Sequence, residues 1–372
     1  MDPFSIFPPE LHRMTVQHLD RKTVVASALV NRSWYRLFCP SVWETVTITT
    51  PIQCEAFGAS VNSGALSRHG HLIRSLKTKN YGVVEMLVAN GAAACTNLTQ
   101  LGVAFKRLRK DSSRGSISVI AQPLVYLLEN NPGLKSVTLH GSILTRWLLM
   151  SQILFALPAS VDHLTLDGNI EWEWPKYEYN EISAEFHEQE LASTSTKSHD
   201  GSRRNLPTLG LRKLELIGAI PGEALVPETL KRSPLLESFV FDDALLYLYM
   251  NGEEKLPSVL RNHCPALTSL DMDPGFLDDG FLSQLVDEAS TKGWKHLAFS
   301  GKGFGPLTEA AIMKHVESLE SVHLNIGLGF PSSSIQRLFC LAPNLKSFRG
   351  GRPSLIYADV QLDATDLIQS PW

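Results

Sequence analysis

Cysteine and histidine are the residues of this 372-residue chain that could carry nucleophilic or metal chemistry. A nucleophilic cysteine needs a lowered thiol pKa, which a nearby histidine or a helix N-terminus can provide. A zinc site needs several cysteines and histidines at close spacing. The five cysteines are scattered without a Cys-x-x-Cys pair, and the close histidine pair, His69 and His71, has no cysteine beside it. The spacing therefore predicts no metal site.

The positions of the cysteines argue against a thiol nucleophile. Cys39 and Cys54 have no flanking histidine and no helix N-terminus beside them. The other three fall at junctions or in helix-like segments of the pattern described below, where we expect small buried hydrophobic side chains. These three are Cys95, Cys264 and Cys340.

The chain contains none of the common catalytic or phosphate-binding motifs. It has no His-Glu-x-x-His, no glycine-rich loop ending in Lys-Ser/Thr, and no Gly-x-Ser-x-Gly. The segment GKGFG at 301–305 is glycine-rich, but it leads through Pro306 into a helix-like segment, so we interpret it as a turn. The sequence predicts no catalytic residue and no cofactor, and function must lie in binding surfaces.

The composition disfavours two classes of partner. The formal net charge of -4 gives no long-range attraction to nucleic acid or to an anionic membrane. The N-terminus, MDPFSIFPPE, is not a signal peptide, and no window approaches the roughly 20 apolar residues of a membrane-spanning helix. The scattered cysteines favour a reduced compartment. We therefore expect a cytoplasmic or nuclear protein with no nucleic-acid or membrane partner.

A six-residue pattern (apolar, two variable, apolar, variable, apolar) recurs along most of the chain. The alternation predicts strands with one buried face, and the spacing is mostly near the roughly 20–29 residues of a leucine-rich repeat. Two degenerate versions, at 43–48 and 71–78, would join the N-terminal module directly to the array. The nine clearer copies lie at 98–103, 134–139, 161–166, 211–216, 236–241, 267–272, 294–299, 319–324 and 345–350.

Helix-like segments between these copies complete the predicted repeat unit. Alternating strands and helices also suit a doubly wound sheet, but near-identical strands at a short period favour a curved parallel solenoid. The predicted fold class is α/β: a small helical module at residues 1–45, then a leucine-rich-repeat solenoid at 46–372 with parallel strands on the concave face and helices outside. The helix-like segments are 123–130, 152–157, 227–233, 256–263, 282–290, 310–318 and 334–342.

Three segments depart from the repeat. Residues 171–206 are predicted to be a loop insertion, which either folds back onto the solenoid or binds a partner. A basic cluster within 106–114 is either a solvated loop or a nuclear-import signal. The helix-like stretch 363–368 leaves open whether the array has an open last repeat or is a fragment.

The first 45 residues contain three short helix-like stretches. Residues 8–10 suit the first turn of a helix, because proline is tolerated there and an acid complements the helix dipole. Residues 24–29 form a second apolar face, and Asn31 is the expected N-cap of a third helix, which we expect to end at Pro40. So many large apolar side chains exceed what so short a segment can bury. They either form an interface or cap the repeats.

The order of residues in this stretch resembles the F-box. The matching run is Phe7-Pro8-x-Glu10-Leu11, Val16, Leu19, Leu29-Val30-Asn31-Arg32-x-Trp34 and Val42-Trp43. Phe7 stands for the usual leucine, Asn31 for the usual cysteine, and Val42 for the leucine before the last tryptophan. The resemblance implies docking on a Skp-type adaptor, and through it on a cullin. The residues implied in that contact are Phe7, Pro8, Pro9, Glu10, Leu11, Val16, Leu19, Leu29, Val30, Trp34 and Trp43.

The residues that flank the second apolar position of each copy should face the concave side of the solenoid. They are mostly small and polar, without the arginine cluster that readers of phosphorylated peptides use. The candidates for binding a protein target are His163, Lys213, Glu215, Asp271, His296, His323 and Arg349.

Taken together, the module and the array resemble F-box proteins with divergent leucine-rich repeats of the fungal kind. That resemblance implies the substrate-recognition subunit of a Skp–cullin–F-box ubiquitin ligase, which holds an unidentified protein target near the ubiquitin carrier. Such a subunit acts by proximity and needs no reactive residue. The alternatives are a Skp-bound scaffold or co-regulator without ubiquitylation, and an enzyme with its own thiol or metal chemistry.

Overall fold

Eleven parallel strands form one sheet in which every strand lies beside its neighbour in the sequence. In the computed structural model of the chain, the described residues are 8–90, 95–105, 117–141, 147–168, 208–218, 225–242, 255–273, 278–301, 304–326 and 332–350. The strands are β1 (Thr45–Ile48), β2 (Ser75–Thr78), β3 (Gln100–Ala104), β4 (Ser136–His140), β5 (His163–Asp167), β6 (Lys213–Ile217), β7 (Ser238–Asp242), β8 (Ser269–Asp273), β9 (His296–Gly301), β10 (Ser321–Ile326) and β11 (Ser347–Gly350).

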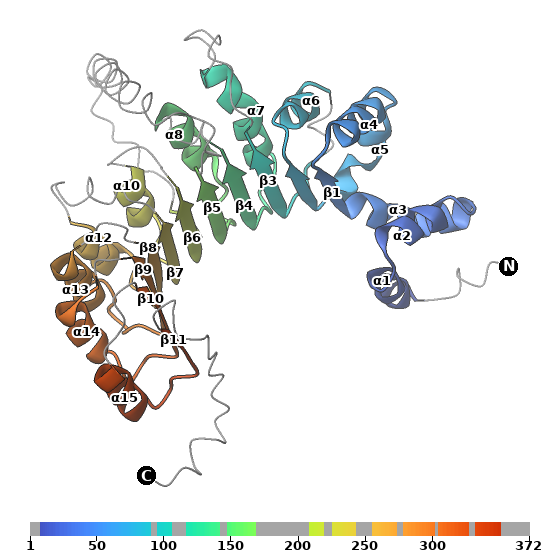
Figure 1. The fold of residues 1–372 in the computed structure, drawn as a ribbon. Helices are drawn as coiled ribbons and strands as arrows, with labels where there is room; N and C mark the ends of the chain where they lie inside the picture. Colours follow the sequence, from blue (N-terminus) through green and yellow to red (C-terminus); the bar gives the residue numbers. More distant parts are fainter. Residues whose placement is uncertain are drawn as a thin grey trace, which may run out of the picture.

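The helices of the repeats lie on the outer side of the curved sheet, and the strands line the inner side (Figure 1). These elements are α4 (Pro51–Asn62), α5 (Ala65–His69), the 3₁₀ turn η2 (Gly70–Leu72), α6 (Gly82–Asn90), α7 (Ile117–Glu129), α8 (Trp147–Ala156), α10 (Leu225–Lys231), α12 (Leu256–His263), α13 (Asp279–Glu288), α14 (Pro306–Met313) and α15 (Ser332–Leu341). The sequential strand order and the single helical layer confirm the predicted solenoid and exclude a doubly wound sheet.

The apolar positions of the six-residue pattern form one continuous core between sheet and helices. In β6, Leu214 and Leu216 are buried while the residues beside them are half-exposed. The strands pair in register, and their buried apolar residues form one core that is continuous from β1 to β10. All nine predicted copies are strands, and the two degenerate segments form β1 and β2.

A ladder of hydrogen bonds joins the repeats just before each strand begins. The carbonyl oxygen of Asp162 accepts from the backbone N–H groups of Arg212 (2.8 Å) and Lys213 (2.9 Å) in the next repeat, and the same arrangement recurs along the array. The residues that provide these carbonyl oxygens have side chains of alternating charge near the C-terminal end of the array. There, the Glu320 carboxylate lies 3.3 Å from Lys295 and 2.6 Å from Lys346. Each strand is thus aligned by the one before it.

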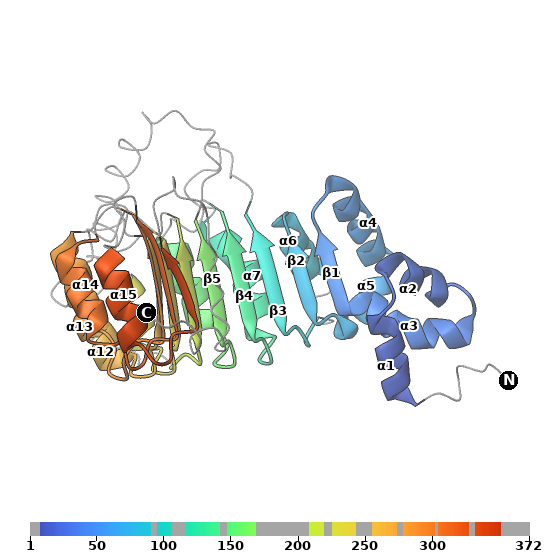
Figure 2. The ribbon, with the colours of Figure 1, turned by 60° about the horizontal axis from the view of Figure 1, so that its bottom comes forward.

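The N-terminal module consists of α1 (Pro9–Gln17), α2 (Arg21–Ala28) and α3 (Arg32–Glu44), and it projects from the first end of the arc (Figures 1 and 2). The expectation that the third helix ends at Pro40 was wrong, because α3 continues to Glu44. Packing of buried Cys39 and half-buried Trp43 on either side of the proline offsets the missing N–H. The Arg21 guanidinium also donates to Thr45 O (2.6 Å) and Val42 O (3.4 Å) at the helix end.

Several predicted features lie outside the described residues. They are Phe7, the insertion at 171–206, the basic cluster within 106–114, and the C-terminal stretch 363–368.

The N-terminus of α14 is capped by a residue of the preceding repeat. Its N-cap, Gly305, has no side chain, and the Asp279 carboxylate of α13 accepts from the N–H groups of Leu307 and Thr308, each at 2.9 Å. The Thr308 hydroxyl donates to Asp279 Oδ1 as well (2.7 Å). Burial raises the pKa of Asp279, but hydrogen bonds from Thr308, Leu307 and Gly305 outweigh it and leave the pKa below its ordinary value.

We predict that Asp279→Ala destabilises the solenoid by about 1–2 kcal/mol, the usual cost of a lost helix cap. Because the folded-state pKa is lowered, the stability from Asp279 is present above the ordinary value near 3.8 and is lost as the pH falls through the folded value. Urea unfolding at neutral pH and at low pH checks both points. The matched control is Asp287→Ala, which removes an exposed ion pair with Lys314 and should cost little. Equal losses in the two variants would contradict the prediction.

Candidate functional site

The three N-terminal helices enclose a small core of their own. Val24, Ala28 and Phe38 are buried in it. The residues packed partly around them are Val16, Leu19, Trp34, Leu37 and Val42. The Trp34 and Phe38 rings lie 5.6 Å apart, centroid to centroid. This core is separate from the long core of the repeats, and it is too small to cover every apolar residue of the module.

The uncovered apolar residues belong to the same three helices. Leu29 is 77% exposed and Val30 60%, and both follow the end of α2. The other exposed large apolar side chains of the module are Leu11, Met14, Val25 and Tyr35. Water-exposed apolar side chains at this density are typical of a surface that a partner covers. We call these six residues the apolar face.

The structure separates the predicted adaptor-contact residues into groups. Pro8, Glu10, Leu11, Leu29 and Val30 are exposed. Val16, Leu19 and Trp34 pack against the small core instead, and Trp43 packs against the core of the repeats. Pro9 is the first residue of α1. The contact of these residues with an adaptor stays a prediction.

Sequence reasoning left Met14, Val25 and Tyr35 out of the predicted contact set. The available signal was helical phase: Leu11 and Met14 are three residues apart, and Val25 and Leu29 are four apart, so each pair shares a side of its helix.

Two side-chain caps fix where α2 and α3 begin. Asn31 Oδ1 accepts from Trp34 N (2.9 Å), which confirms the predicted N-cap. Asp20 caps α2 by accepting from the N–H and the hydroxyl of Thr23, each at 3.0 Å, and these bonds lower the pKa of Asp20. The asparagine that departs from the F-box pattern therefore has a local structural role.

A hydrogen-bonded cluster occupies the middle of the concave face. The Glu215 carboxylate on β6 accepts from Lys213 Nζ (2.5 Å) and Thr165 Oγ1 (2.7 Å), and His163 Nε2 lies 3.5 Å away. Burial raises the pKa of Glu215, but hydrogen bonds from Lys213 and Thr165 outweigh it and leave the pKa below the ordinary value. Three of the predicted target-binding residues thus lie together.

The other predicted target-binding residues lie further along the sheet. His296 Nδ1 is 2.9 Å from Ser321 Oγ, and His323 Nε2 is 3.4 Å from Ser347 Oγ. Asp271 and Arg349 are exposed on β8 and β11. A pair that sequence reasoning missed, His140 and Asp167 (2.9 Å), joins β4 to β5. Each of these two residues directly follows the third apolar position of its copy, so it lies just outside the six-residue pattern that the sequence reasoning used.

The cysteines differ from expectation in three places. Cys54 was expected to have no helix N-terminus beside it, but it is the fourth residue of α4. Cys340, on α15 in the last described repeat, is exposed rather than buried. Cys39 does have a histidine beside it: its Sγ lies 3.7 Å from His69 Nδ1, although the two residues are thirty positions apart. Cys95 and Cys264 are buried as expected, and burial raises the pKa of Cys95 to about 11 and that of Cys264 to about 12.

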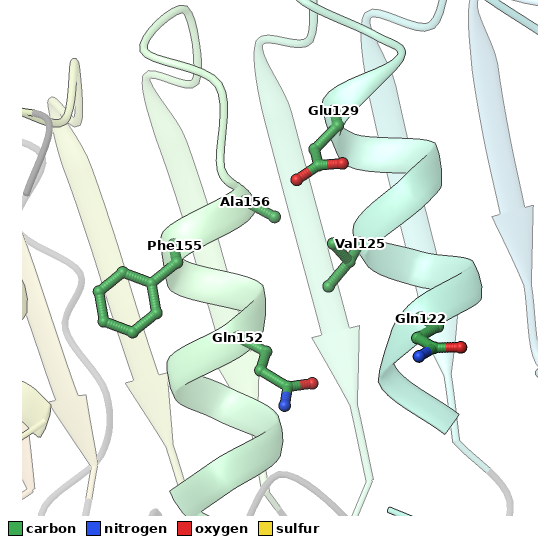
Figure 3. A pocket seen from close by; sticks show the side chains of 6 residues that line it. All are labelled: Gln122, Val125, Glu129, Gln152, Phe155 and Ala156. Atoms are coloured by element: carbon green, nitrogen blue, oxygen red, sulfur yellow. The ribbon is translucent and has the colours of Figure 1, made fainter. Parts of the chain in front are cut away.

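A groove on the outer surface lies between α7 and α8 (Figure 3). Gln122, Glu129 and Gln152 give it a partly polar lining, and the Phe155 ring points away from α7. Within the described part of the chain, no cluster of three histidine, cysteine or acidic residues could hold a metal. No helix there is long and apolar enough to cross a membrane.

Comparison with known proteins identifies the N-terminal module. The F-box domain model matches residues 4–41. No curated protein matches the chain. Among solved structures, the chain is similar to one chain of the crystal structure of the Rad7 and Elc1 complex in yeast. The similarity has 13% identity and a TM-score of 0.37, and it covers 95% of this chain and 96% of that chain.

The F-box domain at residues 4–41 precedes a repeat region with an eleven-stranded parallel sheet. An F-box domain implies binding to a Skp-type adaptor, and so a role as adaptor or receptor in complexes of the Skp–cullin–F-box type.

We predict that Asn31→Ala destabilises the F-box domain by about 1 kcal/mol, because the N–H of Trp34 loses its acceptor. Asn31→Asp keeps the acceptor and should retain most of the stability. Thermal unfolding followed by tryptophan fluorescence measures both changes. If alanine and aspartate behave alike, the cap does not stabilise α3.

Proposed function

We propose that this chain is the substrate-recognition subunit of a Skp–cullin–F-box ubiquitin ligase. The observation that carries the proposal is the apolar face of an F-box domain whose own core leaves Leu29 and Val30 exposed. The adaptor covers this face, and the concave side of the solenoid binds a protein target. The scattered free cysteines support a reduced, cytoplasmic or nuclear setting.

The surfaces on the two parts of the chain differ in chemistry. The apolar face suits a stable contact, because burial of apolar side chains supplies most of the binding energy at protein interfaces. The concave face carries hydrogen-bonding and ionisable groups such as Glu215, Lys213 and His163, which favour specificity over raw affinity. We infer that the adaptor contact is durable and that target contact depends on polar complementarity.

We predict that Leu29→Asp combined with Val30→Asp abolishes adaptor binding. Each change places a charge where an apolar contact would form, and neither residue is part of the small core, so folding should be preserved. The measurement is calorimetric titration with a purified Skp-type adaptor, supported by circular dichroism.

The matched control for this pair is Ile52→Asp on α4. Ile52 is 77% exposed, the same fraction as Leu29, but it lies outside the F-box match. Adaptor affinity should stay at the wild-type value in this variant. Binding by the Leu29/Val30 variant at wild-type affinity would remove the basis of the proposal.

The alternative, a Skp-bound scaffold, predicts the same contact with the adaptor but no assembly with a cullin. Co-purification of the adaptor complex with a cullin separates the two. Recovery of adaptor without cullin under conditions where other F-box proteins retain both would favour the scaffold.

A receptor, in contrast to an enzyme, carries no ubiquitin thioester. Cys340 is the exposed thiol of the five, and the thiols of Cys95 and Cys264 are kept protonated by burial. We predict that incubation with ubiquitin-charged carrier gives no adduct on this chain that a reducing agent removes. A reducible adduct present in wild type and absent from Cys340→Ser would show that the chain transfers ubiquitin itself.

A further inference from the structure

Helix α5, whose last residue is His69, lies between the helices of the F-box domain and the first strands (Figure 2). His69 Nε2 is 2.9 Å from Tyr35 Oη, and His69 Nδ1 is 3.7 Å from Cys39 Sγ. The Trp43 ring stacks on the imidazole at 5.5 Å between centroids, with 28° between the planes. Tyr35, Cys39 and Trp43 are each four residues apart on α3, so one side of the helix presents all three to His69. We call these four residues the His69 junction.

The same atoms do not make a thiol nucleophile. Cys39 is 5% exposed, which leaves no approach for a substrate. Burial lowers the pKa of His69, and the charges of Arg68 and His71 lower it further, so the imidazole is neutral near pH 7. A lowered pKa makes this imidazole a weak base for the thiol proton, and burial disfavours the thiolate–imidazolium pair that proton transfer would create. The cluster is therefore a set of neutral hydrogen-bonding groups and ring contacts.

Further bonds hold the same two parts of the chain together. Glu44, the last residue of α3, provides the carbonyl oxygen that accepts from Arg74 N (2.9 Å), the first rung of the ladder between repeats. Arg21 on α2 donates to Thr45 O at the start of β1. The backbone bond to Glu44 and the side-chain bond from Arg21 both hold the C-terminal end of α3. Through Cys39 and Tyr35, the His69 junction adds contacts roughly one and a half to two and a half turns back along the helix.

We propose that His69 is a positioning residue that fixes the angle between the F-box domain and the repeat solenoid. The inference rests on the proposed function, because that angle determines where a bound target lies relative to the adaptor and the ubiquitin carrier. A fixed angle raises the effective concentration of one region of the target at the carrier.

The junction is sensitive to protonation of His69. A neutral imidazole donates from one nitrogen and accepts at the other, whereas imidazolium has two donors and no acceptor. The titratable groups in contact with it are Tyr35 and Cys39 from α3, and the charges that act on it are those of Arg68 and His71. Since its pKa is lowered when the junction is closed, the junction is fully held above about pH 6.5. It loosens as the pH falls from there towards the lowered value.

The test uses the full chain, with variants His69→Ala, His69→Gln and Tyr35→Phe. Tyr126→Phe is the matched control, because Tyr126 on α7 is 41% exposed, as is Tyr35, and lies far from the junction in the sequence. Hydrogen exchange at the amides of β1 measures the junction locally, and small-angle X-ray scattering at about pH 7.5 and about pH 5.5 measures the distribution of overall shapes.

We expect exchange in β1 to accelerate roughly two- to tenfold in His69→Ala and Tyr35→Phe, the range that loss of one hydrogen bond gives. Exchange in β10 should not change, and Tyr126→Phe should match wild type throughout. Scattering should show a broader shape distribution for wild type at the lower pH. His69→Gln, which keeps a donor and an acceptor but does not titrate, should show little dependence on pH.

The proposal is overturned if His69→Ala and wild type give the same β1 exchange and the same scattering at both pH values. Tyr35→Phe keeps the ring and removes one hydroxyl, so it provides the answer if His69→Ala does not fold. Adaptor titration of wild type and His69→Ala separates this inference from the proposed function; Tyr35→Phe is left out of that titration because Tyr35 belongs to the apolar face. If the wild-type chain does not bind the adaptor, the proposed function is wrong. The exchange and scattering results still decide the role of His69 in that case.

Discussion

The parallel register between consecutive strands is the constraint on which the rest of the structure depends. A carbonyl oxygen just before each strand accepts two N–H groups from the next repeat, as Asp162 does from Arg212 and Lys213. Because every strand is aligned in this way, the apolar positions of all copies meet in one core, and the residues between them form continuous rows on the concave face. The first acceptor in the series is Glu44, the last residue of the F-box helix α3. The F-box domain is therefore aligned by the same bonds that align the repeats.

The apolar residues of the F-box domain have different structural roles, because its core is small. Val24, Ala28 and Phe38 stabilise the three helices, while Leu29 and Val30 are left in water. Trp43 falls in neither group, since it packs against the repeats. A match to a family pattern does not distinguish among these roles, because all of them require apolar side chains at fixed spacing. The exposed fraction of each side chain does distinguish these roles, and it identifies Leu29 and Val30 as the residues to mutate.

The sequence was sufficient to predict the strands, because the six-residue pattern specifies both the secondary structure and the buried face. It also predicted the cap at Asn31, which is a local interaction over three residues. It failed where contacts between distant residues decide the outcome. The helix continues past Pro40 because Arg21 and the packing of Cys39 and Trp43 hold its end. The histidine beside Cys39 is thirty positions away, and local spacing gives no sign of it. Cys340 is exposed because a helix of a repeat buries only the side that faces the sheet.

The alternating charges at the strand starts limit how such an array can change in length during evolution. Lys295, Glu320 and Lys346 occupy the same position in three successive repeats, and the carboxylate lies between the two ammonium groups. Deletion of the single repeat that carries Glu320 would bring Lys295 next to Lys346, and like charges on adjacent strands are destabilising. Deletion or duplication of two repeats at once preserves the alternation. At this end of the chain, the alternation therefore favours adding or removing repeats in pairs, by the small amount, about 1 kcal/mol or less, that exposed charges contribute.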